Sequence, residues 1–438
     1  MGPSSNAGDP AHAPPTPPFR QILFVFGEIG LLSFGGPAAQ IALMHRVLVD
    51  ELRWLDERRF LSALSFCMLL PGPEAMQLAT YSGWRLQGVK GGLAAGLLFV
   101  APGALLVLAL SMLYGVYGQT PAVAALFVGV KAAVLAIVLQ ALVRVANRAI
   151  KGRLDWVVAI AAFVAIFFFN LPFPLVIVAA AAAGYFLRAA EQIEPGGAAA
   201  ASVPVMQTLR TLAVWLAIWL VPLFAVAAIF GSGHVLAQLA YFFSKLAVVT
   251  FGGAYAVLAY MAQEAVTGYQ WLTAGEMLDG LGLAETTNGP LILVTEFVGY
   301  IAALRAGGVG MGVLGALVTL WATFAPCFLW IFVGAPYVEH LTHAPQLASA
   351  LRTVTAAVVG VIANLSLWFA LHVLFARIDE RHVGPLRLFV PDVASLDVVA
   401  LALTCLALVL IFALRWSIVA TLAVCGAAAL LWLGLATV

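Results

Sequence analysis

The sequence predicts an all-α, polytopic membrane protein built from two homologous helical repeats, and three observations lead to that fold class. The 438 residues are 63% hydrophobic, with a mean hydropathy of +1.05. Only 9% are charged. Soluble domains carry roughly 25% charged residues, so the charges here are too few to cover a water-facing surface. Finally, two glycine-rich helix breaks match each other at a spacing of 217 residues.

These two breaks belong to a long internal repeat. Ser33-Phe34-Gly35-Gly36-Pro37 recurs as Thr250-Phe251-Gly252-Gly253-Ala254, and the register holds until Gly72-Pro73 falls on Gly289-Pro290. From Phe34 to Pro73, 13 of 40 positions are identical. Further on, Gly91-Gly92 is matched with Gly307-Gly308, and Lys131 with Thr355. The chain is therefore expected to be a duplication.

Apolar segments divide the chain, because an α-helix needs about 20 apolar residues to cross the hydrocarbon core. The expected segments are 20–48, 57–87, 91–117, 121–149, 154–169, 172–188, 208–230, 235–262, 276–304, 308–336, 347–376, 395–413 and 416–434. They predict a disordered tail (1–18), an N-terminal transporter repeat (19–188), a polar linker (189–206), an unpaired transmembrane helix (207–231) and a C-terminal transporter repeat (232–438).

Seven segments separate the two repeat starts, so full crossings would make the second half inverted relative to the first. The basic loop 144–153 is expected to be cytoplasmic, which also places the N-terminus in the cytoplasm. The arginine-rich loop 46–59 lies on that side only if segments 20–48 and 57–87 are re-entrant. Both segments are interrupted at mid-length, which favours re-entrant hairpins. Full crossings remain the alternative.

The repeated breaks are the first candidate site. A broken helix exposes N–H groups, and its N-terminal end carries a partial positive charge that suits anions. Proline is favoured where such a helix restarts. Close packing of helices through glycine is the alternative explanation. The expected ligand-binding positions are Gly35, Gly36, Pro37, Gly72, Pro73, Gly252, Gly253, Asn288, Gly289 and Pro290.

Charged residues inside apolar segments are the second set of candidates, because such residues are costly in a membrane. Lys245 and Glu28 occupy equivalent repeat positions with opposite charges. They are interpreted either as an anion ligand with its counter-charge or proton carrier, or as a structural ion pair. Lys131, in the middle of a segment, is interpreted as a second cation that faces the substrate cavity.

Acidic residues near each Gly-Pro break are the third set. Glu74, Glu285 and Glu296 are poor partners for an anion and are interpreted as proton sites. Capping of a helix N-terminus is the alternative for Glu74. Enzyme motifs, metal-ligand spacings and cofactor motifs are absent from the sequence, and the net charge of +1 does not indicate a nucleic-acid partner.

These motifs resemble the chromate ion transporter family in its long, two-domain form. The resemblance rests on Ser33–Pro37 with Ala38-Ala39-Gln40, on Trp54-Leu55, on Leu70–Gln77, and in the second half on Phe251–Gly253 and Ala284–Leu291. Ala254 and Asn288 depart from the family pattern, in which Gly and Pro are expected.

The resemblance implies a multi-pass protein of the inner membrane that exports chromate by alternating access and confers chromate resistance. Exchange for protons, as an antiporter, is compatible with the acidic residues. Transport of sulfate or another oxyanion is the nearest alternative, with sulfate otherwise a competitor. An intramembrane enzyme acting on anionic lipid head groups is a more distant alternative. A homodimer is left open, and the lipid bilayer is the expected surrounding.

Overall fold

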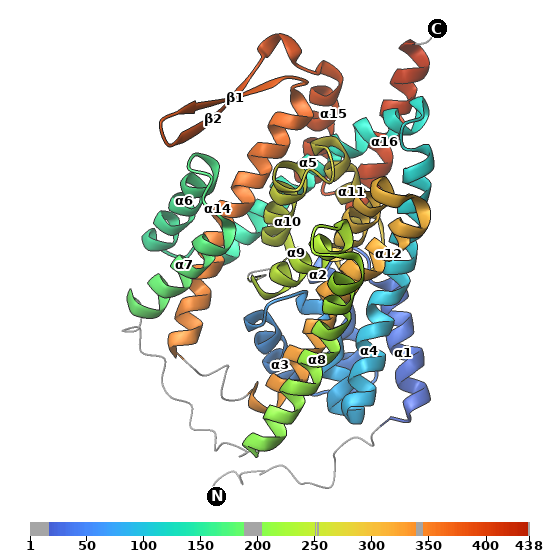
Figure 1. Ribbon diagram of the computed structural model, residues 1–438, viewed down its shortest axis with the longest axis vertical. Coiled ribbons are helices and arrows are strands. Elements are labelled where there is room, and N and C mark those ends of the chain that lie inside the picture. The colour runs from blue at the N-terminus through green and yellow to red at the C-terminus, as the bar shows by residue number, and fades with distance from the viewer. Residues whose placement is uncertain (1–16, 188–203, 250, 252–253, 339–344, 437–438) are drawn as a thin grey trace, which may run out of the picture.

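The computed structural model describes residues 17–187, 204–249, 251, 254–338 and 345–436. This part of the chain is helical apart from one two-stranded hairpin (Figure 1). Nearly all of the predicted tail and linker lie outside the described residues, and so do Gly252 and Gly253.

The helices of the first half follow the predicted segments, with the expected interruptions. They are α1 (Phe19–Leu32), α2 (Gly36–His45) with the π-helical turn η2 (Arg46–Glu51), α3 (Glu57–Leu69), α4 (Glu74–Tyr117), α5 (Pro121–Ala149), α6 (Arg153–Phe167) and α7 (Phe173–Leu187). The predicted unpaired segment is α8 (Val205–Phe230).

The second half repeats the same order and adds a hairpin. Its elements are α9 (Val235–Val249), α10 (Ala254–Gln263) with η3 (Glu264–Gly268), α11 (Ala274–Thr286), η4 (Leu291–Leu293), α12 (Val294–Gly334) with η5 (Ala335–Tyr337), α14 (Pro345–Leu374), β1 (Ile378–Val383), β2 (Leu386–Pro391), η6 (Val393–Ser395), α15 (Val398–Leu408) with η7 (Val409–Ala413) and α16 (Ile418–Ala436).

Six helices within the described ranges are long and apolar enough to cross a membrane. They are Glu74–Tyr117, Pro121–Ala149, Val205–Phe230, Leu291–Tyr337, Ala348–Leu374 and Ile418–Leu435. Together with the near absence of strands from the described residues, they establish an all-α, multi-pass membrane protein.

The backbone itself repeats at the spacing seen in the sequence. The π-helical turns η2 and η3 occupy equivalent positions, and both are followed by a non-glycine residue at positive φ, Arg53 at 52° and Gln270 at 56°. The amide of Trp54 then donates to the Leu48 carbonyl at 2.8 Å, and that of Trp271 donates to the Ala265 carbonyl at 2.8 Å. Matching hydrogen bonds at matching positions are the structural counterpart of the sequence repeat.

Helices α4 and α12 are each folded back on themselves. Non-helical torsions at Gln87-Gly88 and at Gly307-Gly308 divide each helix into two arms, as the segment boundaries predict. A Cβ atom added to Gly83 would meet the Gly91 carbonyl, and one added to Gly299 would meet the Gly315 carbonyl. Glycine therefore lets the two arms of each hairpin touch.

These contacts correct one detail of the predicted alignment. Gly83 and Gly299 are 216 residues apart, but their contact partners Gly91 and Gly315 are 224 apart. The second-half hairpin is thus eight residues longer around its turn. Gly91 is equivalent to Gly315 and not to Gly307, because packing depends on which residues face each other across the arms.

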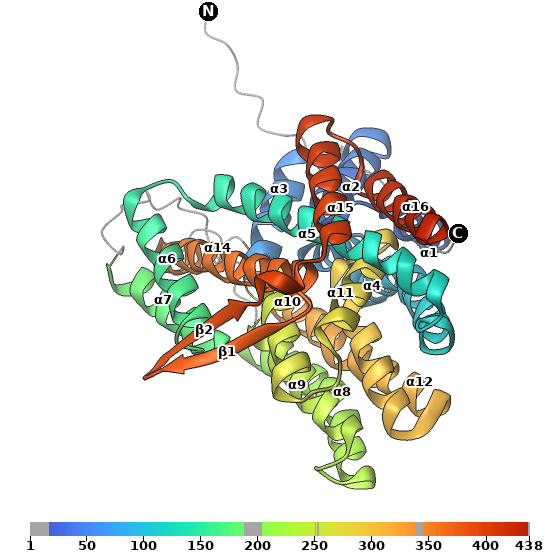
Figure 2. The same ribbon diagram turned by 90° about the horizontal axis from the view of Figure 1, so that it is seen from above.

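The two halves are interlocked through their last helices. Helices α6 and α7 of the first half pack against α14 of the second, while α15 and α16 pack against α5 (Figure 2). Helices α5 and α14 also pack against each other. Each half therefore contributes its terminal pair of helices to the other.

The hairpin β1–β2 is an element that the sequence analysis does not predict. The strands pair antiparallel from Ile378–Pro391 to Val383–Leu386 and turn at Gly384, which has a φ of 61°. The Arg387 amide donates to the Phe168 carbonyl at 2.7 Å, just beyond the end of α6. The charged residues of this stretch hide the alternation of apolar and polar residues that would predict a strand. The segment against which the hairpin packs, at the end of α6, belongs to the other half.

Substitution of Gly83 by alanine is expected to destabilise the α4 hairpin. The new Cβ atom would lie 2.5 Å from the Ala95 Cβ and would overlap the Gly91 carbonyl. Overpacking of this kind costs about 1–3 kcal/mol. Thermal unfolding of the purified protein measures the loss. Gly310→Ala is the matched control, because nothing lies within 4 Å of a Cβ atom there. Equal melting temperatures for the two variants would contradict the close approach of the arms.

Candidate functional site

The first break separates α1 from α2 and depends on glycine. The Ser33 hydroxyl donates to the Ile29 carbonyl at 2.6 Å and ends α1. Gly35 and Gly36 have φ angles of 88° and 79°, in the left-handed region that favours glycine. Pro37 then lies in the first turn of α2, where its missing N–H costs nothing. Gly35 is exposed, and Gly36 and Pro37 are half-buried.

The structure brings this break against the Gly-Pro break of the other half. The Gly289 amide donates to the Ser33 carbonyl at 2.9 Å. The Asn288 side chain donates to the Gly30 carbonyl at 3.2 Å. Gln40 of α2 donates through Nε2 to the Gly289 carbonyl at 2.6 Å and to the Ser33 carbonyl at 3.3 Å. We call these contacts the break junction. It joins residues that are 249 or more positions apart in the sequence, apart from the local Gln40–Ser33 contact.

The second arms of α4 and α12 each lie against the Gly-Pro break of the opposite half. A Cβ atom on Gly103 of α4 would overlap the Asn288 carbonyl. The repeat equivalent of Gly103 is Cys327, whose Sγ atom lies 3.0 Å from the Cβ position of Gly72. The two Gly-Pro breaks therefore have related surroundings. The contact at the second-half break is with the Asn288 backbone carbonyl, whereas the contact at the first-half break is with the Cys327 side chain.

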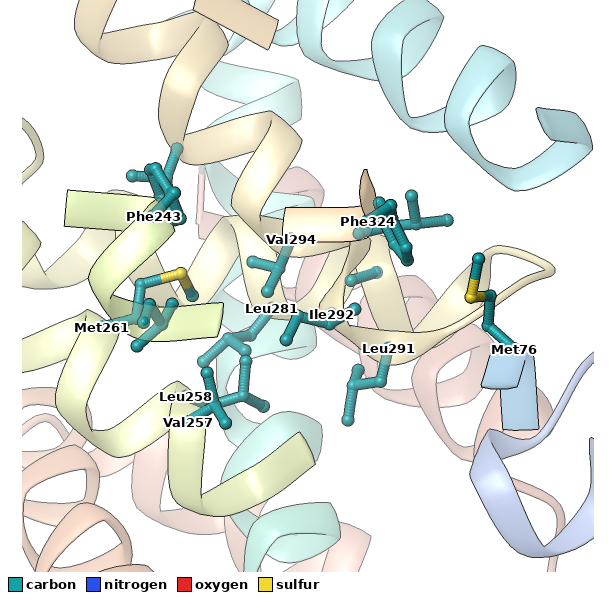
Figure 3. Close-up of a cluster of buried hydrophobic side chains, with 14 of the residues drawn as sticks. Met76, Phe243, Val257, Leu258, Met261, Leu281, Leu291, Ile292, Val294 and Phe324 are labelled. Atoms are coloured by element: carbon teal, nitrogen blue, oxygen red, sulfur yellow. The ribbon is translucent and has the colours of Figure 1, made fainter. Parts of the chain in front are cut away.

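Beyond the break junction, the chain after Pro290 is sealed by apolar side chains. Figure 3 shows Leu291, Ile292 and Val294 next to Leu281 and Leu258 of the neighbouring helices α11 and α10. All five are buried. Asn288, Gly289 and Pro290 are buried as well. The side of the junction that carries Gly35 and Pro37 is therefore less buried than the side that carries Gly289 and Pro290.

Lys131 does not lie at the break junction but forms a separate polar cluster with the other half. Its Nζ atom is 3.3 Å from Oδ1 of Asp279 in α11. The Tyr114 hydroxyl donates to Asp279 Oδ2 at 2.7 Å. Tyr114 is itself held edge-on by Phe127 and Phe297. We call Lys131, Asp279 and Tyr114 the charged triad.

Lys245 and Glu28 do not form the ion pair considered from the sequence. Both side chains are exposed, and no contact between them is found among the described residues. The Lys245 ammonium instead lies 5.6 Å from the centre of the Tyr260 ring, in a cation–π contact. The ion-pair interpretation is therefore wrong, because each charge faces outward from its own helix.

The three predicted proton sites differ in their surroundings. Glu74 is the half-buried first residue of α4, which also fits its alternative role as a cap. Glu285 is buried and accepts a hydrogen bond of 2.9 Å from the Tyr255 hydroxyl. Glu296 is 1% exposed, and neither carboxyl oxygen has a hydrogen-bond partner among the described residues. Since an unpaired buried charge is very costly, Glu296 best fits a group that holds a proton.

Sequence reasoning missed Asp279, Tyr114 and the bridging role of Gln40. Asp279 lies within the apolar run Met277-Leu278-Asp279-Gly280-Leu281, so the rule that selected Lys131 and Lys245 could have found it. Gln40 appears in the sequence only as part of a motif. Its function as a bridge depends on a contact with the other half, which has no local signal.

The comparisons with known proteins agree with this architecture. The chromate transporter family model matches residues 20–185 and 237–431, one block in each half. A chromate transport protein of Pseudomonas aeruginosa is 34% identical over 379 residues, covering 85% of both chains. A chromate transport protein of Cupriavidus metallidurans is 29% identical and covers 83% of this chain and 85% of its own. No solved structure matches.

A shorter relative supports the duplication. The uncharacterized transporter YwrB of Bacillus subtilis is 30% identical over 151 residues, which are 34% of this chain and 76% of its own. The match covers most of YwrB but only a third of this chain. Such a match is expected if this chain contains two copies of a unit that is present once in YwrB. The family consists of transporters and not enzymes, which removes the lipid-modifying alternative. With both halves matched in order, the chain belongs to the chromate transporter family.

Proposed function

We propose that this protein exports chromate from the cytoplasm across the inner membrane and thereby confers chromate resistance. The observation that carries the proposal is the break junction, where interrupted helices of the two halves meet through the Gly289 amide and the Ser33 carbonyl at 2.9 Å. Discontinuous helices at the interface of two repeats are typical of transporter binding sites. Membership of the chromate transporter family supports chromate as the substrate.

Alternating access would move one half against the other around this junction. The hydrogen bonds of Asn288, Gly289 and Gln40 are few enough to break and re-form in such a movement. We propose that the halves are inverted and that segments 20–48 and 57–87 are re-entrant. Helix α1 has 14 residues and α3 has 13, so each spans roughly 20 Å, which is short of the hydrocarbon thickness of about 30 Å.

The substrate would bind at the positive ends of the helices that restart after the breaks. Gly35, Gly36 and Pro37 open α2, and Gly72 and Pro73 precede α4. The Gly289 amide already donates to Ser33, so it becomes available to an anion only when the junction opens. Lys131, in the separate charged triad, and the exposed Lys245 would supply positive charge elsewhere along the route of the anion. Gly252 and Gly253, outside the described residues, are proposed from the repeat alone.

The energetics are compatible with export. Each negative charge that leaves a cell with a negative interior gains about 2.3 kcal/mol per 100 mV, so a dianion leaves downhill electrically. Coupling to protons would use Glu296 as the first candidate carrier, and Glu285, Glu74 and Glu28 as further ones. Sulfate is the second candidate substrate, because backbone amides and lysine recognise the charge and shape of a tetrahedral oxyanion and not its central atom.

Everted membrane vesicles test the proposal. Wild-type vesicles are expected to accumulate chromate, and excess sulfate is expected to reduce the accumulation if the two anions share the site. Lys245→Ala is expected to reduce uptake if that exposed lysine attracts the anion. Vesicles that accumulate sulfate but no chromate would replace chromate by the second candidate. Vesicles that accumulate neither anion would overturn the proposal, provided that the protein is present in the membrane.

A further inference from the structure

The charged triad crosses the two halves but has no counterpart in the repeat. Lys131 and Tyr114 come from α5 and α4 of the first half, and Asp279 comes from α11 of the second. Their repeat equivalents, none of which is charged, are Thr355, Val338 and Ser62, respectively. If the scaffold needed an ion pair at this position, both halves would be expected to contain one. The single copy therefore indicates a task that the molecule performs once.

Lys131 lies between the buried carboxylate of Asp279 and an open cavity. The cavity has a volume of about 190 Å³ and is lined by Lys131, Gly275, His372 and Asp397, among others. The Lys131 side chain is 26% exposed, whereas that of Asp279 is 7% exposed. The Lys131 side chain thus lies between the cavity and the buried Asp279 carboxylate.

The other polar groups of the cavity already have partners. His372 Nδ1 lies 2.8 Å from the Trp368 carbonyl. Asp397 accepts a hydrogen bond of 2.9 Å from the Ala400 amide at the start of α15. Lys131 is consequently the ammonium group that the cavity offers to an anion, and His372 would carry a positive charge only when protonated.

We propose that this cavity binds a tetrahedral oxyanion through Lys131 and that Asp279 is a built-in competitor for the same ammonium group. This inference rests on the proposed function and deepens it. In the empty state Lys131 is paired with Asp279. When the oxyanion takes the ammonium, the Asp279 carboxylate binds a proton from the water of the cavity, and Tyr114 continues to donate to it.

The coupling follows from the burial of Asp279. A buried carboxylate that loses its cation is left as an unpaired charge, which is more costly than the neutral acid. Oxyanion binding therefore favours proton binding, and by reciprocity a proton on Asp279 favours the oxyanion. The triad would link substrate binding to protonation in one step.

Other titratable groups near Asp279 are accounted for by their own contacts. Glu276, one turn earlier on α11, is bonded to Arg305 of α12. Tyr114 and Lys131 belong to the triad itself. Across the cavity, Asp397 caps a helix, and His372 of α14 remains as a second group that could respond to pH. The experiment must therefore separate Asp279 from His372.

Equilibrium binding of radiolabelled chromate to the purified, full-length protein in nanodiscs tests the proposal. Wild type and Asp279→Asn are compared at mildly acidic and mildly alkaline pH, so that changes in chromate protonation cancel between them. Asp279→Asn is expected to bind more tightly than wild type by about tenfold at alkaline pH and equally at acidic pH. Lys131→Gln is expected to lose this binding. Glu276→Gln is the matched control, with the pH response of wild type.

The outcomes separate this inference from the function on which it rests. Chromate binding by wild type with no pH-dependent difference from Asp279→Asn would overturn the role of Asp279 alone. A pH response that persists in Asp279→Asn but disappears in His372→Gln would assign the coupling to His372 instead. A double variant, Lys131→Gln with Asp279→Asn, that regains both thermal stability and full transport would show that the pair is only structural. No chromate binding by wild type would remove the proposed substrate as well.

Discussion

Replacing Gly103 by alanine is expected to abolish chromate transport and to destabilise the protein. The added Cβ atom would overlap the Asn288 carbonyl, which belongs to the break junction and cannot move aside as a side chain can. Alanine gains up to about 1 kcal/mol in helix propensity, but overpacking against backbone costs about 1–3 kcal/mol. Vesicle uptake and thermal unfolding measure the two effects separately.

The repeat supplies a matched control for this prediction. Cys327 occupies the position equivalent to Gly103, against the Gly-Pro break of the first half. Cys327→Ala produces the same residue there but removes an atom instead of adding one. We expect it to retain transport, with a modest loss of stability from the small cavity. If Gly103→Ala transports chromate as well as Cys327→Ala does, the close approach at Asn288 is not required for the transport cycle.

Glu296→Gln is expected to weaken the dependence of chromate transport on the pH gradient. The side chain is 1% exposed, and its carboxyl group has no hydrogen-bond partner among the described residues. A proton can therefore bind and leave without breaking an ion pair. Its repeat equivalent is Thr80, whose hydroxyl is satisfied by the Met76 carbonyl at 2.9 Å. A neutral, satisfied residue in one half and an acid without a partner in the other indicate a function beyond packing.

Vesicles with an imposed pH gradient measure this effect. Wild-type uptake is expected to differ between vesicles with an acidic interior and vesicles with an alkaline interior. Glu296→Gln uptake is expected to differ much less between the two, with only the coupling at Asp279 remaining. Glu57→Gln, a change at an exposed acid bonded to His45, is the control and should respond like wild type. A Glu296→Gln variant that keeps the full pH response would exclude this residue as the proton carrier.

The fold class was accessible from the sequence because it depends on local chemistry. Composition alone excludes a water-facing surface, and apolar length selects the spanning helices. The breaks at Gly35 and Gly72 were predictable because a positive φ and a missing N–H are properties of single residues. The repeat was visible because Gly-Gly, Trp and Gly-Pro are uncommon enough to stand out from a background of alanine and leucine.

Features that depend on how segments pack against one another were not predictable from the sequence. The register of Gly91 was wrong, since eight extra residues at the α12 turn change which glycines face each other. The hairpin β1–β2 was not predicted, and its arginine at 387 docks next to the end of α6. The outward direction of Lys245 and Glu28 follows from helix rotation, which their equivalent positions do not specify.

By itself, the sequence determined that this is a duplicated, helical membrane protein with interrupted helices, and its motifs identified the family. Only the tertiary structure decided that the Gly35 break meets Gly289, that Gln40 bridges them and that Lys131 is paired with Asp279. The physical reason is the range of the interactions. Hydrophobicity and backbone torsion act within a few residues, whereas these contacts join groups that are more than 140 positions apart, and only packing of the two halves brings them together.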